Sequence, residues 1–339
     1  MRALAMTRWP RLPRLPRIAV TLMLTLLAAA SAGAFDLQGH RGARGLAPEN
    51  TLAAFSEALA LGVTTLELDV GITRDGVLVV SHDRYLNADI TRDAQGEFLA
   101  TRGPVIASLP LAELQRYDVG RIKPGSAYAR VFAEQRGRDG ERIPTLAAVF
   151  DLAAKRGANV RFNIETKVSP LAADETLPPE PFVRALIAAI RRAKLADRVT
   201  IQSFDWRTLQ IAQRQAPEIA TVYLSNEQGA GDTVRRAATN GSPWLAGLSL
   251  AEHGGSLPRL VRAAGGRIWS PNFRDLTLQQ VEEAHTLGLS VIAWTVNDMN
   301  DAARLLDWGV DGIISDYPDR LRALLKSRGM ALPTAYPPP

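Results

Sequence analysis

The sequence of 339 residues contains no cysteine. This absence excludes disulfide bonds, a lipid-modified cysteine, thiolate catalysis and cysteine-ligated metal sites. Low-complexity tracts are also missing, and 46% of the residues are hydrophobic. A chain of this size and composition can bury a substantial core, in one large domain or two ordinary ones, without covalent cross-links.

The first 34 residues lack acidic side chains and differ from the rest. A proline-rich segment with five arginines precedes the apolar run "IAVTLMLTLLAAASAGA", which ends in the small residues 32–34. Basic, apolar and small-residue regions in this order are typical of a signal peptide. The apolar run is short for a membrane span, which needs about 20 residues. We therefore expect cleavage before Phe35, export to the periplasm or the medium, and no stable membrane insertion afterwards.

Without the leader, the chain has no excess of basic over acidic residues. The whole sequence has 40 basic and 35 acidic residues, and five of the basic ones lie in the leader. The mature chain is therefore neutral. Its charge gives no indication of nucleic-acid binding, and the sequence predicts no oligomeric state.

Strand-like and helix-like runs alternate through the rest of the chain. Eight principal strands are expected to end near His40, Asp69, Lys167, Phe204, Ser225, Phe273, Asn297 and Asp316. Such alternation predicts a parallel sheet. Eight units with polar residues at the strand ends predict an α/β fold, a TIM (β/α)₈ barrel, over residues 35–326. A doubly wound sheet is the alternative.

Three segments depart from this alternation. Residues 84–143 are too long for an ordinary loop, which predicts an insertion subdomain over one barrel mouth, after the second strand region. Within 226–266, the run "WLAGLSL" fits a further strand. Residues 327–339 are expected to form a disordered tail.

Acidic residues gather at two of the expected strand ends. Glu67 and Asp69 are two residues apart in "LELDV", so both point to the same face of a strand, and Glu165 and Lys167 have the same relation in "FNIETK". Three carboxylates at one barrel mouth cannot all stay ionised cheaply without a cation. All-oxygen ligands favour Ca²⁺ or Mg²⁺ over zinc. The alternative is a buried network of lysine and carboxylates that only stiffens the barrel.

Two histidines follow strand-like runs, His40 in "FDLQGH" and His82 in "GVLVVSH". Two imidazoles facing one metal-bound group suit an acid–base pair near neutral pH. Arg41 and Lys167 bring positive charge to the same mouth, and this combination suits an anionic phosphate ester. The glycines around His40 would let the backbone approach that phosphate closely. His253 has no assigned role.

Eight short motifs occur between residues 40 and 318: "HRGARGLAPENT", "ELDV", "HD", "IPTL", "NIETK", "QSFDW", "AWTVN" and "DGIISDYP". Together, and in this order, they resemble the glycerophosphodiester phosphodiesterase family. The resemblance implies a TIM barrel with an insertion after the second strand. It also implies hydrolysis of a glycerophosphodiester to sn-glycerol 3-phosphate and an alcohol. The long insertion resembles the long bacterial forms, which favours a secreted enzyme.

The resemblance also implies roles for individual residues. The catalytic pair and the metal ligands that it implies are His40, His82, Glu67, Asp69 and Glu165. The substrate contacts that it implies are Arg41, Lys167, Glu49, Asn50, Phe204 and Trp294. Asn50 also fits the N-cap of a helix, and the two aromatic residues also fit core packing. The implied partners are a divalent metal, Ca²⁺ or Mg²⁺, and a small-molecule glycerophosphodiester.

Three alternative functions stay open. Phospholipase D toxins of the sphingomyelinase type share the barrel and the histidine pair, but they use disulfides, which this chain cannot form. A phosphatidylinositol phospholipase C has a similar barrel, but "PENT" and "DGIISDYP" are not its motifs. A barrel that binds phosphodiesters without cleaving them is the third alternative. The intact set of histidine, carboxylate and lysine residues argues against it.

Overall fold

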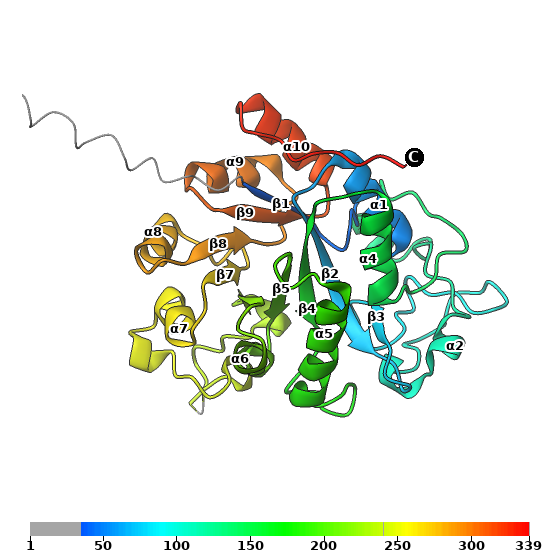
Figure 1. The fold of residues 1–339 in the computed structure, drawn as a ribbon, viewed down its shortest axis with the longest axis horizontal. Coiled ribbons are helices and arrows are strands. Elements are labelled where there is room, and N and C mark those ends of the chain that lie inside the picture. Colours follow the sequence, from blue (N-terminus) through cyan, green and yellow to red (C-terminus); the bar gives the residue numbers. More distant parts are fainter. Residues whose placement is uncertain (1–34, 240, 339) are drawn as a thin grey trace, which may run out of the picture. The chain divides into compact units, whose positions relative to one another are not determined.

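The computed structural model describes residues 35–239 and 241–338, so the predicted signal peptide over 1–34 lies outside the described residues. Eight parallel strands in the described part close into a barrel (Figure 1). In chain order they are β1 (Asp36–Gly39), β2 (Thr65–Ile72), β4 (Arg161–Thr166), β5 (Val199–Ser203), β6 (Ala220–Ser225), β7 (Ile268–Pro271), β8 (Ser290–Ala293) and β9 (Gly312–Ser315). The barrel closes because β1 pairs in parallel with both β9 and β2. The predicted TIM barrel is confirmed, and the doubly wound alternative is wrong.

Helices surround the barrel (Figure 1). Those that follow the barrel strands are α1 (Leu52–Leu61), α4 (Leu146–Lys155), α5 (Pro179–Ala193), α6 (Trp206–Gln215), α7 (Leu257–Ala263), α8 (Leu278–Thr286), α9 (Met299–Asp307) and α10 (Pro318–Ser327). Their buried apolar residues join those of the strands in one large core. No helix in the described part combines the length and the apolar character that a membrane crossing requires.

Strand β2 shows how the sequence builds both layers of the barrel. Leu66, Leu68 and Val70 are fully buried in the core. Because side chains alternate along a strand, Glu67 and Asp69 lie on the opposite face. The same strand therefore supplies packing on one side and acidic side chains on the other.

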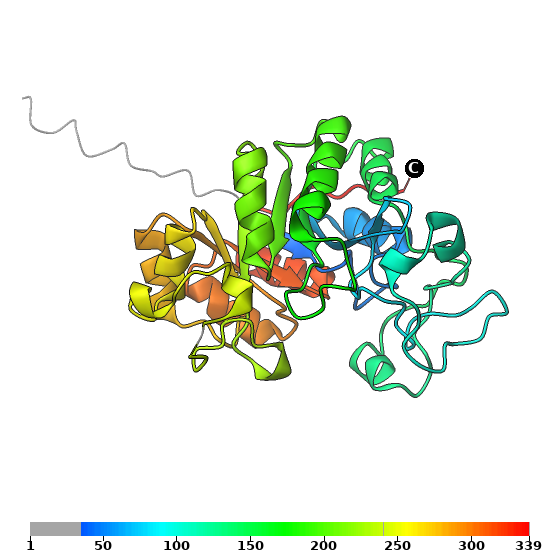
Figure 2. The same ribbon diagram turned by 90° about the horizontal axis from the view of Figure 1, so that it is seen from below.

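The insertion, residues 84–143, builds a small core of its own. It is entered through β3 (Leu78–Val80), which pairs antiparallel with the end of β2 and places Val80 opposite Val70. Its short helices are η1 (Ile106–Ser108), α2 (Leu111–Leu114) and α3 (Ala127–Val131). Leu86 and Ile143 belong to a second buried cluster, separate from the main core. Figure 2 shows this segment, cyan to blue-green, as a lobe at one side of the barrel.

The expected additional strand in "WLAGLSL" is wrong. The described part of the β6–β7 connection forms short helical turns, η2 (Gly229–Gly231), η3 (Pro243–Leu245) and η4 (Ala251–His253). Ser242 caps η3 by accepting a hydrogen bond from the Trp244 amide, and Ala246 ends it with a φ of 55°. A proline at the first helical position and a capping serine before it favour a helical turn over a strand.

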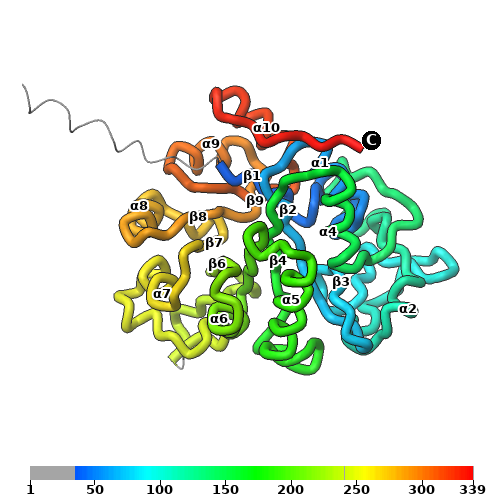
Figure 3. Tube along the Cα trace, viewed as in Figure 1, coloured from blue at the N-terminus to red at the C-terminus, as the bar shows by residue number. Residues whose placement is uncertain are grey.

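The expected disorder of residues 327–339 is also wrong for the described part of that segment. The Tyr336 amide donates to the Leu59 carbonyl at 2.7 Å, and Arg322 donates to the Pro333 carbonyl at 2.7 Å. Leu332 and Tyr336 pack against the main core. Figure 3 shows this segment, in red, running from α10 toward α1. Its prolines restrict the backbone beforehand, so less conformational entropy is lost when the segment docks.

Candidate active site

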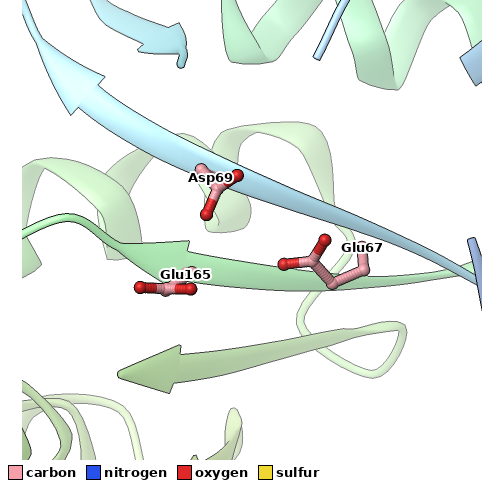
Figure 4. Close-up of side chains that lie close together, drawn as sticks. All are labelled: Glu67, Asp69 and Glu165. Atoms are coloured by element: carbon pink, nitrogen blue, oxygen red, sulfur yellow. The ribbon is translucent and has the colours of Figure 1, made fainter. Parts of the chain in front are cut away.

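Three carboxylates form one group on the inner side of β2 and β4 (Figure 4). The parallel register places Asp69 opposite Glu165, and Glu67 lies two residues before Asp69. Each of the three offers a ligand oxygen within 4.8 Å of the others, and all three side chains are buried. The structure thus brings together the three metal ligands proposed from the sequence, hereafter the carboxylate cluster.

The cations around the carboxylate cluster are too few to balance it. Lys167 Nζ lies 2.6 Å from Glu165 Oε1 and 3.5 Å from Asp69 Oδ1. Arg41 Nη1 lies 2.7 Å from Glu49 Oε1, and Arg41 Nε lies 3.4 Å from Asp69 Oδ2. With Glu49 added to the three members of the cluster, four carboxylates face two cations. The deficit equals the charge of one divalent ion.

The pKa values of these carboxyl groups reflect the same deficit. Burial, together with the charge of Asp69, raises the pKa of Glu67 well above its usual range. Burial raises the pKa of Glu165 to about 7 against the opposing charge of Lys167. Burial also opposes ionisation of Asp69, but nearby cations outweigh it and lower its pKa. Asp69 Oδ1 is buried and accepts no hydrogen bond from the described residues. Raised pKa values of Glu67 and Glu165 and an unsatisfied oxygen of Asp69 fit a hard divalent cation as the missing partner.

Both oxygens of Glu67 are held in place. The Arg41 amide donates to Oε2 at 2.9 Å, and Gln202 Nε2 donates to Oε1 at 2.7 Å. Gln202 lies on β5 opposite Glu165 in the register. We did not predict a role for Gln202 from the sequence. Its place in "QSFDW", at the end of an expected strand, was the available signal.

The glycines beside His40 allow a tight turn. A Cβ atom on Gly39 would lie 2.1 Å from the Gly42 carbonyl oxygen, and one on Gly42, at φ +88°, would lie 2.6 Å from Ala54. Arg41 has a φ of 50° within this turn. Any residue larger than glycine at positions 39 and 42 would prevent the turn that directs the Arg41 amide toward Glu67.

His40 forms a pair with an aspartate that we did not predict to have a role. Its Nδ1 lies 2.6 Å from Asp316 Oδ1, at the end of β9, and its Nε2 lies 3.9 Å from Glu67 Oε2. Burial, strengthened by the charge of Arg44, lowers the pKa of His40 to about 4. Burial opposes ionisation of Asp316, but the charge of Arg44 and the hydrogen bonds from Arg44 and His40 outweigh it and hold the pKa of Asp316 below the usual range. Since an ionised carboxylate only accepts, Nδ1 carries the hydrogen and Nε2 is free to accept a proton.

His82 has the same arrangement. Its Nδ1 lies 2.9 Å from Asp83 Oδ1, and Asp83 Oδ2 accepts a hydrogen bond from Asn87 at 2.7 Å. Burial lowers the pKa of His82 to about 3, and the charges of Arg41 and Lys167 add to this effect. Both imidazoles are therefore neutral near pH 7, with Nε2 as the free nitrogen.

A cavity of about 200 Å³ lies between these groups. Its charged and polar lining consists of His40, Arg41, Arg44, Glu67, His82, Glu165, Gln202 and Thr295. Its apolar lining consists of Phe204, Leu224, Trp294 and Ile314. The Phe204 and Trp294 rings meet edge to face at 5.3 Å, and Trp294 Nε1 donates to the Ser270 carbonyl at 2.9 Å. The cavity therefore suits an anionic group attached to a small organic moiety.

Three residues expected to contact substrate lie beside this cavity rather than in its lining. Lys167 is bound to the carboxylate cluster, and Glu49 is bound to Arg41. Asn50 donates to Asp69 Oδ2 at 2.9 Å. The N-cap of α1 is Thr51, whose hydroxyl accepts from the helix backbone, so the capping alternative for Asn50 is wrong. In this structure Glu49 and Asn50 support the groups that face the cavity.

The fold and the site define a phosphodiesterase on a TIM barrel: carboxylates, cations and two neutral imidazoles converge at the carboxyl ends of the strands, where such barrels carry their active sites. The chain belongs to the family described as the glycerophosphoryl diester phosphodiesterase family, whose sequence model matches residues 40–320, and its enzyme class is that of a glycerophosphodiester phosphodiesterase.

Similar proteins cover most of the chain. A glycerophosphodiester phosphodiesterase of Caldanaerobacter subterraneus is 30% identical over 86% of this chain and 97% of its own length. A structure from Silicibacter pomeroyi, described as a glycerophosphoryl diester phosphodiesterase, has a TM-score of 0.78 and 37% identity over 88% of this chain and 95% of that one. A phosphodiesterase of Oleispira antarctica, in complex with the product sn-glycerol-3-phosphate, has a TM-score of 0.62. It is 26% identical over 85% of this chain and 96% of that chain.

Proposed function

We propose that this chain hydrolyses glycerophosphodiesters to sn-glycerol 3-phosphate and an alcohol, with a divalent cation on the carboxylate cluster and with His40 and His82 as acid and base. The observation that carries the proposal is the position of two aspartate-paired imidazoles beside buried carboxylates, four with Glu49 included, that only two cations face in the described part of the chain. The Oleispira antarctica relative, solved with sn-glycerol-3-phosphate, supports the choice of product.

The cation site consists of Glu67, Asp69 and Glu165, and its oxygen ligands suit Ca²⁺ or Mg²⁺. A divalent ion bound there supplies Lewis-acid polarisation of a phosphoryl oxygen. Arg41, in the cavity wall, and Lys167, beside the cluster, offset the negative charge of the phosphodiester.

The two histidines act on opposite sides of the phosphorus. Nε2 of one accepts the proton of the attacking hydroxyl, from water or from the glycerol 2-position, as the new P–O bond forms. The other, which must first take up a proton at Nε2 from solvent as the anionic substrate binds, donates that proton to the alkoxide oxygen as the old P–O bond breaks. Asp316 and Asp83 hold each ring by Nδ1 and stabilise it when it carries both protons. The aromatic wall of Phe204 and Trp294 excludes water beside the organic moiety.

Turnover of a substrate panel tests this proposal. Release of sn-glycerol 3-phosphate from glycerophosphocholine and glycerophosphoethanolamine is the expected result, with no products from sphingomyelin or phosphatidylinositol. Turnover of sphingomyelin or phosphatidylinositol alone would instead identify a lipid phosphodiesterase. Saturable binding of glycerophosphocholine without product would identify a binding protein.

We also propose that residues 1–34 are a signal peptide and that the enzyme is secreted or periplasmic. The support is the order of a basic, an apolar and a small-residue region in the sequence. N-terminal sequencing of protein from fractionated cells should find Phe35 first in the exported fraction. Cytosolic protein with an intact Met1 would refute this proposal.

A further inference from the structure

We infer that Arg44 is a positioning residue that connects the insertion to His40 through Asp316. Arg44 Nε donates to Asp316 Oδ1 at 2.7 Å, and Nη2 donates to Oδ2 at 3.0 Å. The same Oδ1 lies 2.6 Å from His40 Nδ1. The fork of the guanidinium thus fixes the plane of the carboxylate that orients the imidazole.

The insertion holds the other side of Arg44. The Arg44 guanidinium lies over the Phe132 ring, 4.5 Å from its centroid, and Phe132 is buried. The Arg44 carbonyl accepts a hydrogen bond from Gln135 Nε2 at 2.7 Å, and the Arg136 amide donates to the Leu46 carbonyl at 2.9 Å. Residues 132–136 of the insertion therefore lie on the loop that carries His40.

Charge alone does not account for this arrangement. Asn297 Nδ2 also donates to Asp316 Oδ2, at 2.6 Å, and the Asp316 amide donates to Asn297 Oδ1 at 3.0 Å. A lysine at position 44 would neutralise Asp316, but it has neither the fork nor the flat face that stacks on Phe132. The Arg44→Lys substitution therefore separates the effect of the guanidinium's geometry from the effect of its charge.

The insertion also holds the second histidine pair, because the Asp83 carboxylate accepts from Asn87. That contact is a single hydrogen bond, whereas Arg44 makes two. We assign the stronger positioning effect to Arg44. It gives the insertion a part in catalysis through His40.

A double-mutant cycle on the full enzyme tests this inference, which rests on the proposed role of His40. With glycerophosphocholine as substrate, Arg44→Met should lower kcat by about 10–100-fold, because small misplacements of a catalytic group cost up to about that much, and should leave KM within about threefold. Arg44→Lys should lower kcat nearly as far, and Phe132→Leu should lower it less. In a His40→Ala background, all three changes should have no further effect on kcat.

Arg320→Met is the matched control, because Arg320 pairs with Glu134 of the insertion and stacks on Tyr317 without touching Asp316. It should leave kcat unchanged. Equal losses from Arg44→Met in both backgrounds, or a raised KM with unchanged kcat, would overturn the positioning role. If Arg44→Met does not fold, Arg44→Lys decides: full kcat in this variant would also overturn it. Full activity of His40→Ala by itself would instead refute the proposed function.

Discussion

Each histidine at the barrel mouth is held in one tautomer, because an aspartate faces its Nδ1. The burial that lowers the pKa of both rings leaves two free Nε2 atoms at neutral pH. In a symmetric pair of this kind, each ring can serve one side of the phosphorus, and neither can serve both in the same step.

We therefore expect His40 and His82 to be non-redundant. Each alanine variant should lose about 10²–10⁴ in kcat, the usual contribution of a general acid or base. The double variant should lose far less than the product of the two single losses, since the pair acts as a unit. Steady-state kinetics with glycerophosphocholine measures all three values. Losses of only a few-fold, with metal still bound, would contradict a histidine pair at the reacting phosphate.

A change of leaving group can show which histidine is the acid and which is the base. A p-nitrophenyl phosphodiester needs little protonation of its leaving oxygen, so it should restore turnover in the variant that lacks the acid but not in the variant that lacks the base. Comparison of kcat for the two alanine variants on both substrates gives the assignment. Equal rescue of both variants, or of neither, would contradict a division into acid and base.

Glu67 belongs to the carboxylate cluster, and its charge should matter more than its shape. Glu67→Gln keeps the side-chain length, but it removes one charge from the proposed cation site. The affinity for Ca²⁺ or Mg²⁺, measured by calorimetry, should fall by at least about tenfold, because carboxylate charge is the main source of affinity for hard cations. Glu113→Gln, on the exposed side of α2, is the control. Equal affinity of both variants would show that the cation is not bound by Glu67.

At the residue scale, the sequence identified the groups that follow a local pattern. Glu67, Asp69 and Glu165 follow the two-residue period of strands. Asp316 was placed at an expected strand end, but its pairing with His40 was missed because the two residues are 276 positions apart and meet only when the barrel closes. Arg44 was missed for the same reason, since only the folded barrel brings it to Asp316.

At the element scale, β2 divides stability and function between its two faces. Leu68 is fully buried between the barrel and its helices, whereas Asp69 lies in the carboxylate cluster. Period-two alternation predicted this division from the sequence. The run "WLAGLSL" was predicted less well, because its apolar residues suit a strand or a buried turn equally and Pro243 decides for the turn.

This division is testable with two neighbouring substitutions. Leu68→Ala should lower the free energy of unfolding by about 2–5 kcal/mol, the usual cost of a leucine-sized cavity, with metal affinity unchanged. Asp69→Asn should abolish metal binding and change the free energy of unfolding much less, because it leaves the core intact. Denaturant unfolding and calorimetry measure the two quantities. A large loss of metal affinity in Leu68→Ala, with the fold retained, would contradict the separation of the two faces.

At the scale of the whole molecule, the chain segment after α10 docks on the elements at the start of the barrel. Arg156 Nη1 donates to the Tyr336 carbonyl at 3.1 Å, and the Tyr336 amide donates to the Leu59 carbonyl. Composition alone suggested disorder for this proline-rich segment. The apolar side chains that dock it, Leu332 and Tyr336, find their partners only after the barrel has formed.

Removal of residues 333–339 should therefore destabilise the enzyme without changing its chemistry. We expect the free energy of unfolding to fall by about 1–3 kcal/mol, from the lost hydrogen bonds and the lost burial of one aromatic ring. The kcat on glycerophosphocholine should be unchanged at 25 °C. Thermal unfolding and steady-state assays of the truncated and full chains provide the comparison. Equal stability of both would show that the docked segment contributes nothing.

We expect hydrolysis to require a divalent cation held by the carboxylate cluster. The most direct test is the release of sn-glycerol 3-phosphate from glycerophosphocholine after exhaustive chelation and again after Ca²⁺ or Mg²⁺ is added back. We predict that chelation abolishes turnover and that one of these ions restores it. The Glu67→Gln variant should need a higher concentration of the same ion. Full activity after exhaustive chelation would contradict a requirement for a divalent cation.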